Sequence, residues 1–235
     1  MELKNRVCVI TGATGGLGSV VTRQFAANGA RLALISTNTQ KLQTLSKALN
    51  LPAQSAWFGA YDLRRAESAR QAAQDVLHRF GKVDILIHTV GGWVGGKPLV
   101  ETPEHDMAAM LDQHLWSAFH TAQGFIPLMT ANGWGRFVVI SAPSAVQPSA
   151  KGAPYAAGKA ALEAMTLSLA QDLKGSGVTA NIIQVSFIDT EHKRDQAPTP
   201  ANAGWSTPEE ITAAILYLCS PEGGRLNGAR LPLFG

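Results

Sequence analysis

Short runs of apolar residues alternate with longer segments whose apolar positions recur at helical spacing. A short apolar run is typical of a strand buried on both faces, and the longer segments indicate helices with one buried face. Strands are predicted at 6–10, 31–36, 55–60, 83–89, 137–141, 179–185 and 230–234, the third being the poorest. Helices are predicted at 19–28, 38–49, from beyond Asp62 through Phe80, and at 103–129, 155–174 and 208–220.

This alternation predicts an α/β fold in which a parallel sheet carries helices on both faces. A length of 235 residues fits one domain, so we expect a doubly wound, Rossmann-type sheet of about seven strands over residues 1–235. Such sheets bind ligands beyond the carboxyl ends of their strands. We therefore expect one crevice lined by residues that follow the strands: Thr14, Asp62, Gly91, Ser141 and Thr190.

Composition limits the classes of function. Apolar residues make up 46% of the chain and charged residues 16%, which predicts a large core and no extensive disorder. The net charge is only +3 and no block of lysine or arginine occurs, so neither nucleic acid nor a membrane is indicated as a partner. Without a signal-peptide pattern, Cys8 and Cys219 are interpreted as reduced, buried thiols of a cytoplasmic protein. No metal site is predicted.

The first predicted strand runs directly into a glycine-rich turn, Thr11-Gly-Ala-Thr-Gly-Gly-Leu-Gly18, and then into a helix. The free N–H groups and positive dipole end of a helix N-terminus favour an anion, and glycine lets a pyrophosphate approach the backbone. The spacing differs from the general dinucleotide pattern Gly-x-Gly-x-x-Gly. The turn predicts a nucleotide site at Gly12, Thr14, Gly16, Leu17 and Gly18.

Tyr155 and Lys159 are four residues apart, so on a helix they share one face. A phenol ionises near pH ~10, and a neighbouring ammonium group lowers that pKa. The pair is thus a candidate proton donor with its tuning charge, although the motif alone has little specificity.

The glycine turn and the Tyr-x-x-x-Lys pair, in this order, resemble the short-chain dehydrogenase/reductase family over essentially the full chain. The resemblance implies an NAD(P)(H)-dependent oxidoreductase acting on a small carbonyl or imine-type substrate. Lys159 would hold the nicotinamide ribose and lower the pKa of Tyr155, which would donate a proton as hydride is transferred. It also implies that Asp62 and Leu63 lie at the adenine, and that Asn181 and 188–190, including Ile188 and Thr190, hold the nicotinamide.

The chain departs from the family pattern at several catalytic positions. The family's serine, thirteen residues before the tyrosine, is Ala142 here, flanked by Ser141 and Ser144, either of which could supply the hydroxyl. The asparagine of the fourth helix is His114, a candidate proton-relay residue. The Asn-Asn-Ala-Gly motif reads His88-Thr-Val-Gly91, and His88 is more readily explained as a core residue.

Some of these departures resemble the dihydropteridine reductase branch, which has alanine at the serine position and a Gly-Gly-Trp-x-Gly-Gly stretch like 91–96. Trp93 could then stack on a flat heteroaromatic ring, or it could only pack the loop. Reduction of a quinonoid dihydropterin is therefore an alternative to a general carbonyl reductase. A third hypothesis, a non-catalytic NADP(H)-binding scaffold or redox sensor, fits the altered serine and asparagine but not the intact Tyr155 and Lys159.

The end of the second strand bears on cofactor choice. Ser36, Thr37 and Asn38 stand where NAD enzymes place an acid that binds the ribose 2′-hydroxyl. Three short donors without an acid favour NADP(H), with NAD(H) as a possible cofactor.

Substrate contacts are expected from loops at 91–100, 142–154 and 190–207, the last having the composition of a mobile lid. By resemblance, the helices at 103–129 and 155–174 would pair in a homodimer or homotetramer.

Overall fold

The computed structural model describes residues 3–234 and contains a seven-stranded sheet in the order β3-β2-β1-β4-β5-β6-β7, with every neighbouring pair parallel. This confirms the predicted doubly wound α/β fold. The strands are β1 (Val7–Thr11), β2 (Arg31–Ser36), β3 (Ala56–Ala60), β4 (Ile85–His88), β5 (Gly135–Ser141), β6 (Val178–Gln184) and β7 (Arg230–Pro232).

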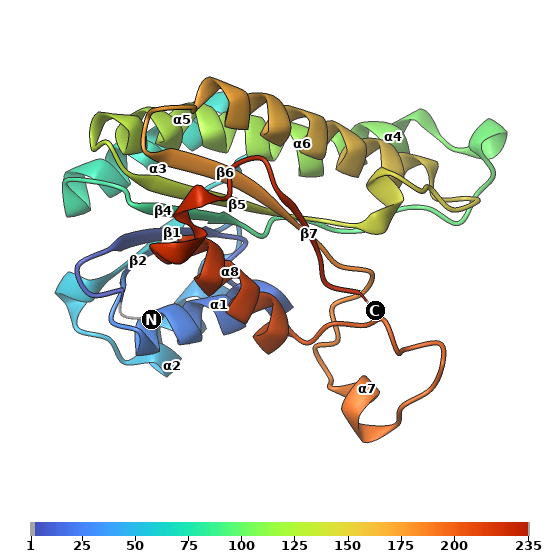
Figure 1. The fold of residues 1–235 in the computed structure, drawn as a ribbon, viewed down its shortest axis with the longest axis horizontal. Coiled ribbons are helices and arrows are strands. Elements are labelled where there is room, and N and C mark those ends of the chain that lie inside the picture. Colours follow the sequence, from blue (N-terminus) through green and yellow to red (C-terminus); the bar gives the residue numbers. More distant parts are fainter. Residues whose placement is uncertain (1–2, 235) are drawn as a thin grey trace.

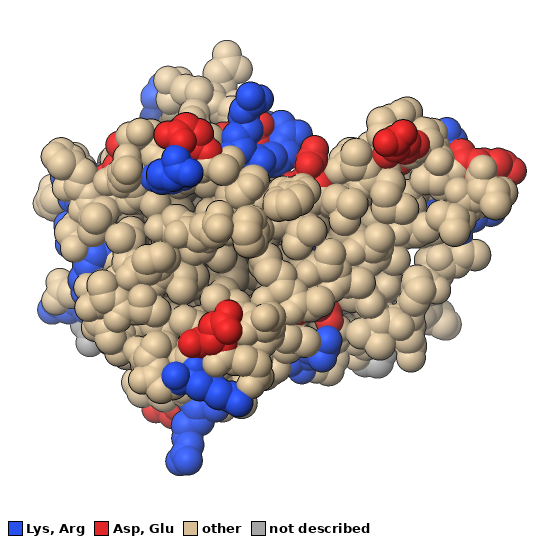
Figure 2. Space-filling model, turned by 90° about the horizontal axis from the view of Figure 1, so that it is seen from above, with Lys and Arg blue, Asp and Glu red and all other residues tan. Residues whose placement is uncertain are grey.

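Helices cover both faces of the sheet (Figure 1). One face carries α1 (Gly16–Ala27), α2 (Thr39–Leu49) and α8 (Pro208–Cys219). The other carries α3 (Ala66–Phe80), α5 (Ser117–Ala131) and α6 (Ala153–Asp172), with α4 (Glu104–Leu111) extending this layer. Figure 2 shows this second layer from outside, with charged side chains mostly near its edges.

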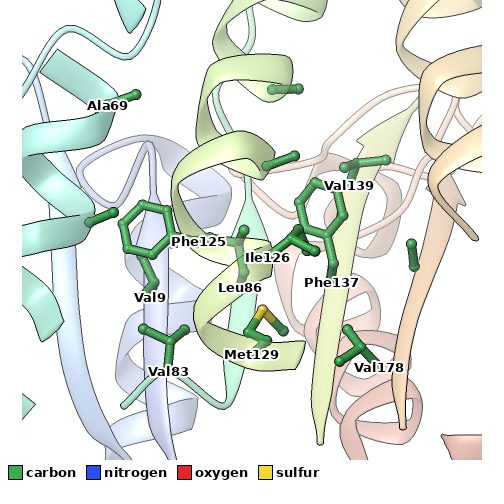
Figure 3. Close-up of a cluster of buried hydrophobic side chains, with 14 of the residues drawn as sticks. Val9, Ala69, Val83, Leu86, Phe125, Ile126, Met129, Phe137, Val139 and Val178 are labelled. Atoms are coloured by element: carbon green, nitrogen blue, oxygen red, sulfur yellow. The ribbon is translucent and has the colours of Figure 1, made fainter. Parts of the chain in front are cut away.

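Strand residues alternate between the two cores, as the pleat requires. Val7 and Val9 of β1 face the α3–α5–α6 layer, whereas Cys8 and Ile10 face the α1–α2–α8 layer. In Figure 3, Phe125, Ile126 and Met129 of α5 lie against strand residues that include Leu86 and Phe137. Because β1 is buried on both faces, its sequence is a continuous apolar run rather than an alternating one.

The helix predicted at 103–129 is helical without a gap from Glu104 to Ala131, but it contains a π-turn that the sequence did not predict. It consists of α4, the π-helix η3 (Asp112–Trp116) and α5, which ends at Ala131. The wider turn brings His114 fully into the interior. Such π-turns are frequent at functional sites, and one extra residue in a turn leaves no clear mark on hydrophobic periodicity. The third helix begins at Ala66, after a turn at 62–65, and ends at Phe80 as predicted.

The order of the strands makes a crevice between β1 and β4. The chain goes outward from β1 through β2 to β3 and then returns to β4 on the other side of β1. The loops after β1 and β4 therefore diverge at the carboxyl end of the sheet, where doubly wound folds bind ligands. The 190–207 segment, with the short helix α7 (Lys193–Gln196), extends away from the sheet (Figure 1). In residues 3–234, no helix combines the length and apolarity needed to cross a membrane.

Candidate active site

The glycine turn after β1 is packed too closely for side chains. Gly12 has a φ of +69°, and a Cβ there would come 2.9 Å from the backbone of Thr89. A Cβ on Gly18 would lie 2.2 Å from the carbonyl oxygen of Gly12. The N-cap of α1, Gly15, provides no side-chain hydrogen bond to the first N–H groups of the helix. The turn is thus a cradle in which backbone donors can hold a phosphate.

Two cavities adjoin at this turn and share Gly15, Thr89, Val90 and Gly91. The smaller has a volume of about 330 Å³ and lies between the ends of β1, β2 and β3. The larger, about 830 Å³, extends over the start of α1 toward α6 and the loops after β4, β5 and β6. A cradle for phosphate between two cavities has the layout that a dinucleotide needs, with one cavity for each nucleoside.

Most of the predicted site residues meet in these cavities. The smaller is lined by Gly12, Thr14, Ser36, Thr37, Asp62 and Leu63, and the larger by Gly16, Leu17, Gly18, Trp93, His114, Ser141, Ser144, Tyr155, Lys159 and Ile188, with Gly91 in both. Asn38 and Thr190 lie outside these cavities. Asn38 caps α2 by accepting a hydrogen bond from the Lys41 N–H at 2.9 Å, and it lines neither cavity. Thr190 packs its methyl group against Gly16 without lining either one.

Tyr155 and Lys159 lie one turn apart on α6, and the Lys159 Nζ is 5.6 Å from the centre of the Tyr155 ring. The Nζ donates a hydrogen bond to the carbonyl oxygen of Ile140 at 2.9 Å. Burial lowers the pKa of Lys159 to about 7 and raises the pKa of Tyr155. The expected lowering of the Tyr155 pKa is therefore not seen in the protein alone, because burial desolvates the phenol and raises its pKa.

His114 reaches the site from the π-helix. Its Nε2 lies 3.0 Å from the carbonyl oxygen of Gly92, and its ring packs edge-on against Tyr155 with 5.4 Å between centroids. Burial, with the nearby Lys159 charge, lowers the pKa of His114 to about 3. The ring is therefore neutral at physiological pH and donates through Nε2, which leaves Nδ1 as an acceptor.

His88 belongs to a closed hydrogen-bond chain under the site. The Ser117 hydroxyl donates to the carbonyl oxygen of Gln113 at 2.6 Å, so it accepts from the His88 Nε2 at 3.1 Å. The Nδ1 of His88 then accepts from the Thr11 hydroxyl at 2.9 Å. Burial lowers its pKa to about 3. His88 is a neutral core residue that ties β1 and β4 to the π-helix, as the sequence indicated.

Two serine hydroxyls flank the position of Ala142. Ser141 ends β5 and Ser144 lies in the short helix η4 (Pro143–Ala145), and both line the larger cavity with Ala142. The Oγ atoms of Ser141 and Ser144 are buried and have no hydrogen-bond partner among the described residues. Buried hydroxyls without partners are costly in a folded protein, and a ligand oxygen in the cavity would satisfy one of them.

Arg64 is a cavity residue that the sequence reasoning missed. It lines the smaller cavity with Ser36 and Thr37, and its guanidinium forms two hydrogen bonds of 2.8 Å with the carboxylate of Asp62. These hydrogen bonds lower the pKa of Asp62. An arginine two residues after Asp62 was the available indication in the sequence. Only the fold shows that the loop carrying Arg64 faces the end of β2.

Asn181 does not fit the nicotinamide role that the resemblance implied. Its amide donates to the carbonyl oxygen of Leu226 at 2.8 Å and accepts from the Ala229 N–H at 2.9 Å. It is buried within β6 and pins the segment that leads to β7. Of the residues implied for this role, Ile188 lines the larger cavity.

Aromatic side chains surround the entrance to the larger cavity. Trp93 and Phe187 line it and remain more than half exposed, at 65% and 51%. Trp205 supports Phe187, with 4.3 Å between ring centroids. The Gly96 N–H donates to the carbonyl oxygen of Lys151 at 2.8 Å, which joins the loops after β4 and β5. Lys159 is the one Lys or Arg residue in the described lining, which contains no acidic residue.

Known proteins have similar sequences and the same fold. The family model described as short chain dehydrogenase matches residues 6–201. The 3-oxoacyl-(acyl-carrier-protein) reductase FabG of Thermotoga maritima is 28% identical over 100% of this chain and 98% of its own length. The 2,3-dihydroxy-2,3-dihydro-p-cumate dehydrogenase of Pseudomonas putida is also 28% identical, over 100% and 95%.

Two solved structures share the fold. The L-sorbose reductase of Gluconobacter frateurii, complexed with NADPH and L-sorbose, has a TM-score of 0.88 at 23% identity and covers 100% of this chain and 97% of its own. An NAD⁺-bound xylitol dehydrogenase has a TM-score of 0.88 at 22% identity, with full coverage of both chains. The fold, the glycine turn and the family match together define the class: this chain belongs to the short-chain dehydrogenase family of oxidoreductases.

Proposed function

We propose that this protein is an NADP(H)-dependent reductase of a small, uncharged carbonyl or imine-type substrate. The observation that carries the proposal is the position of Tyr155 and Lys159, which lie in the cavity that adjoins the phosphate cradle. A phenol there can reach a substrate beside the nicotinamide ring.

The residues present fit a nicotinamide dinucleotide. Gly12 and Gly18 let the turn pack without side chains, and the backbone N–H groups at the start of α1 would hold the pyrophosphate. Thr190, packed on Gly16, and Ile188 would lie beside the nicotinamide half. Hydride transfer at the nicotinamide ring is the chemistry that the bound cofactor supplies.

Tyr155 would act as general acid, its Oη donating a proton to the substrate oxygen or nitrogen. Lys159, in its ammonium form, would bind the nicotinamide ribose and stabilise the phenolate that proton donation leaves. Ser141 or Ser144 would donate a hydrogen bond to the same substrate atom. His114 Nδ1, an acceptor without a partner in the described chain, would accept from a water molecule on the proton path to Lys159.

Arg64, Ser36 and Thr37 support NADP(H) as the preferred cofactor. All three line the cavity that would take the adenine nucleotide, and a guanidinium matches the geometry of a phosphate. An acidic side chain at the end of β2 would repel that phosphate, and Ser36 and Thr37 stand there instead. Asp62, held by Arg64, would contact the adenine.

The entrance favours an uncharged, flat substrate. Trp93 and Phe187 offer aromatic faces, and the lining holds no charged group other than Lys159. A quinonoid dihydropterin is the second candidate, since it is flat and conjugated and Trp93 could stack on it. Ala142 also favours it, because a reactive conjugated acceptor depends less on an extra hydroxyl than a simple ketone does.

We also propose that the protein forms a homodimer or homotetramer through the α4–α5 and α6 layer. Charged side chains are sparse at the centre of this face (Figure 2). Trp116, on the π-helix of the same layer, is 44% exposed beside Phe119. Light scattering coupled to size-exclusion chromatography would test this, since a monomer at micromolar concentration would contradict it.

The decay of reduced-nicotinamide absorbance tests the proposed function. NADPH and NADH would be compared with a quinonoid dihydropterin and a panel of small ketones, quinones and imines. We expect turnover of at least one acceptor, with a lower KM for NADPH than for NADH. Tight NADPH binding without oxidation by any acceptor would favour the non-catalytic scaffold or redox sensor instead.

A further inference from the structure

Glu163 is a buried carboxylate that the steps above do not use. It lies on α6 four residues after Lys159 and eight after Tyr155, so the three side chains share one face of the helix. Its side chain is only 2% exposed. Gln184 of β6 donates to Oε1 at 2.8 Å, and Arg230 of β7 donates to Oε2 at 2.6 Å. Both oxygens are therefore held in place between α6 and the edge of the sheet.

The groups around Lys159 leave its charge poorly compensated. His88 faces it from β4 and His114 from the π-helix, and burial lowers the pKa of each ring to about 3, so both are neutral. Tyr155, on the same helix, is a neutral phenol whose pKa is raised by burial. Among the residues described, Glu163 is thus the anion next to Lys159. Burial lowers the pKa of Lys159 to about 7, and the charge of Glu163 opposes that decrease.

Glu163 stands between two cations that differ in exposure. Lys159 is buried, whereas the side chain of Arg230 is 43% exposed and hydrogen-bonded to the carboxylate. Lys159 donates its hydrogen bond to the Ile140 carbonyl, so its interaction with Glu163 is a charge–charge attraction without a direct hydrogen bond. A cation bound to this carboxylate would, by Coulomb's law, partly cancel the field of Glu163 at Lys159.

We propose that Glu163 is a positioning residue that keeps Lys159 in its ammonium form, and that Arg230 limits how strongly it does so. The functional consequence rests on the proposed role of Lys159 in holding the nicotinamide ribose. Two single substitutions that break the same ion pair then have opposite effects on Lys159. Glu163→Gln removes the favourable charge, and Arg230→Gln removes the opposing one.

NMR titration of the cofactor-free protein, labelled with ¹³C at the lysine Cε, tests the proposal directly. Lys159→Met identifies the Lys159 signal. We expect the titration midpoint of Lys159 to fall by roughly one pH unit in Glu163→Gln and to rise in Arg230→Gln. In Glu163→Asp, which keeps the negative charge, the Lys159 midpoint should lie close to that of the wild type. A midpoint that stays unchanged, or that moves in the same direction in both variants, would overturn the proposal.

The two variants also separate an electrostatic role from a structural one. A purely structural ion pair predicts similar losses of thermal stability and no opposite shifts. If Glu163→Gln does not fold, Arg230→Gln alone still tests the proposal. A Lys159 midpoint that does not rise in this variant would contradict it. The titration needs no turnover, so it is independent of the acceptor panel. If turnover is found, the basic limb of the kcat profile should move in the same two directions.

Discussion

The Nε2 atom of His114 lies 3.0 Å from the carbonyl oxygen of Gly92, so the ring donates a hydrogen bond to the loop that follows β4. This contact fixes the ring with its bare Nδ1 toward the buried space near Gly91 and Lys159. A neutral histidine in this orientation offers an acceptor, as the side-chain oxygen of an asparagine would.

The first prediction concerns His114. His114→Asn should keep most of the activity, while His114→Leu, which removes the acceptor, should lower kcat by roughly 10²-fold. Because burial lowers the pKa of His114 to about 3, neither change should move a limb of the pH profile between pH 5 and 9. The exposed His105, replaced by asparagine, is the matched control. Loss of a limb near pH 6 to 7 in His114→Asn would contradict this account.

Stability should increase with pH because of Lys159. Its pKa is about 7 in the folded protein and ~10.4 in an unfolded chain, so the unfolded state binds more protons between these values. The free energy of unfolding should therefore rise from pH 7 to 10, by no more than about 1.4 kcal/mol per pH unit from this group. Urea unfolding of the wild type and Lys159→Met measures it. The free energy of unfolding of the wild type minus that of Lys159→Met should increase across this range. A value that stays constant with pH would contradict the low pKa of Lys159.

Arg64 should decide cofactor preference. Charge-assisted hydrogen bonds contribute about 1.5–3 kcal/mol, so Arg64→Gln should weaken NADPH binding by roughly tenfold or more and NADH binding much less. Isothermal titration of both cofactors measures this, with the exposed Arg70→Gln on α3 as control. Equal losses for the two cofactors would mean that Arg64 acts only through Asp62 and not on the 2′-phosphate.

Ala142 should limit the reduction of simple ketones. If the nearby serines substitute only in part, Ala142→Ser should raise kcat on a ketone, by up to roughly 10²-fold. Replacing Ser141 and Ser144 together by alanine should lower kcat by a comparable factor, and the single variants identify the donor. Turnover that stays within twofold in the double variant would show that neither hydroxyl serves the reaction.

The sequence predicted the strands and helices that have a regular hydrophobic pattern. It did not predict the π-turn or the cavity position of Arg64, which have no such pattern. Strands such as β1 are buried on both faces, so their apolar runs are readable, whereas the π-helix around His114 has no periodic signature. Motif positions such as Gly12 and Lys159 fell into the cavities because the topology brings the strand ends together. Arg64 could not be assigned in this way, because its role depends on a loop that approaches β2 from another strand.

Asn38 and Asn181 make structural contacts that the sequence did not predict. Asn38 follows the strand end that bears on cofactor choice, and Asn181 lies where the family pattern suggests a cofactor contact. One caps α2 and the other pins the segment before β7. A short amide side chain satisfies a nearby backbone group as readily as a ligand, and only the fold shows which one it meets.

The most direct test of the central claim is Tyr155→Phe, which removes the proposed proton donor and leaves the ring in place. With an acceptor that the wild type reduces, we predict that turnover falls by at least ~10²-fold while the dissociation constant for NADPH stays within threefold. Turnover close to that of the wild type would contradict the assignment of Tyr155 as general acid.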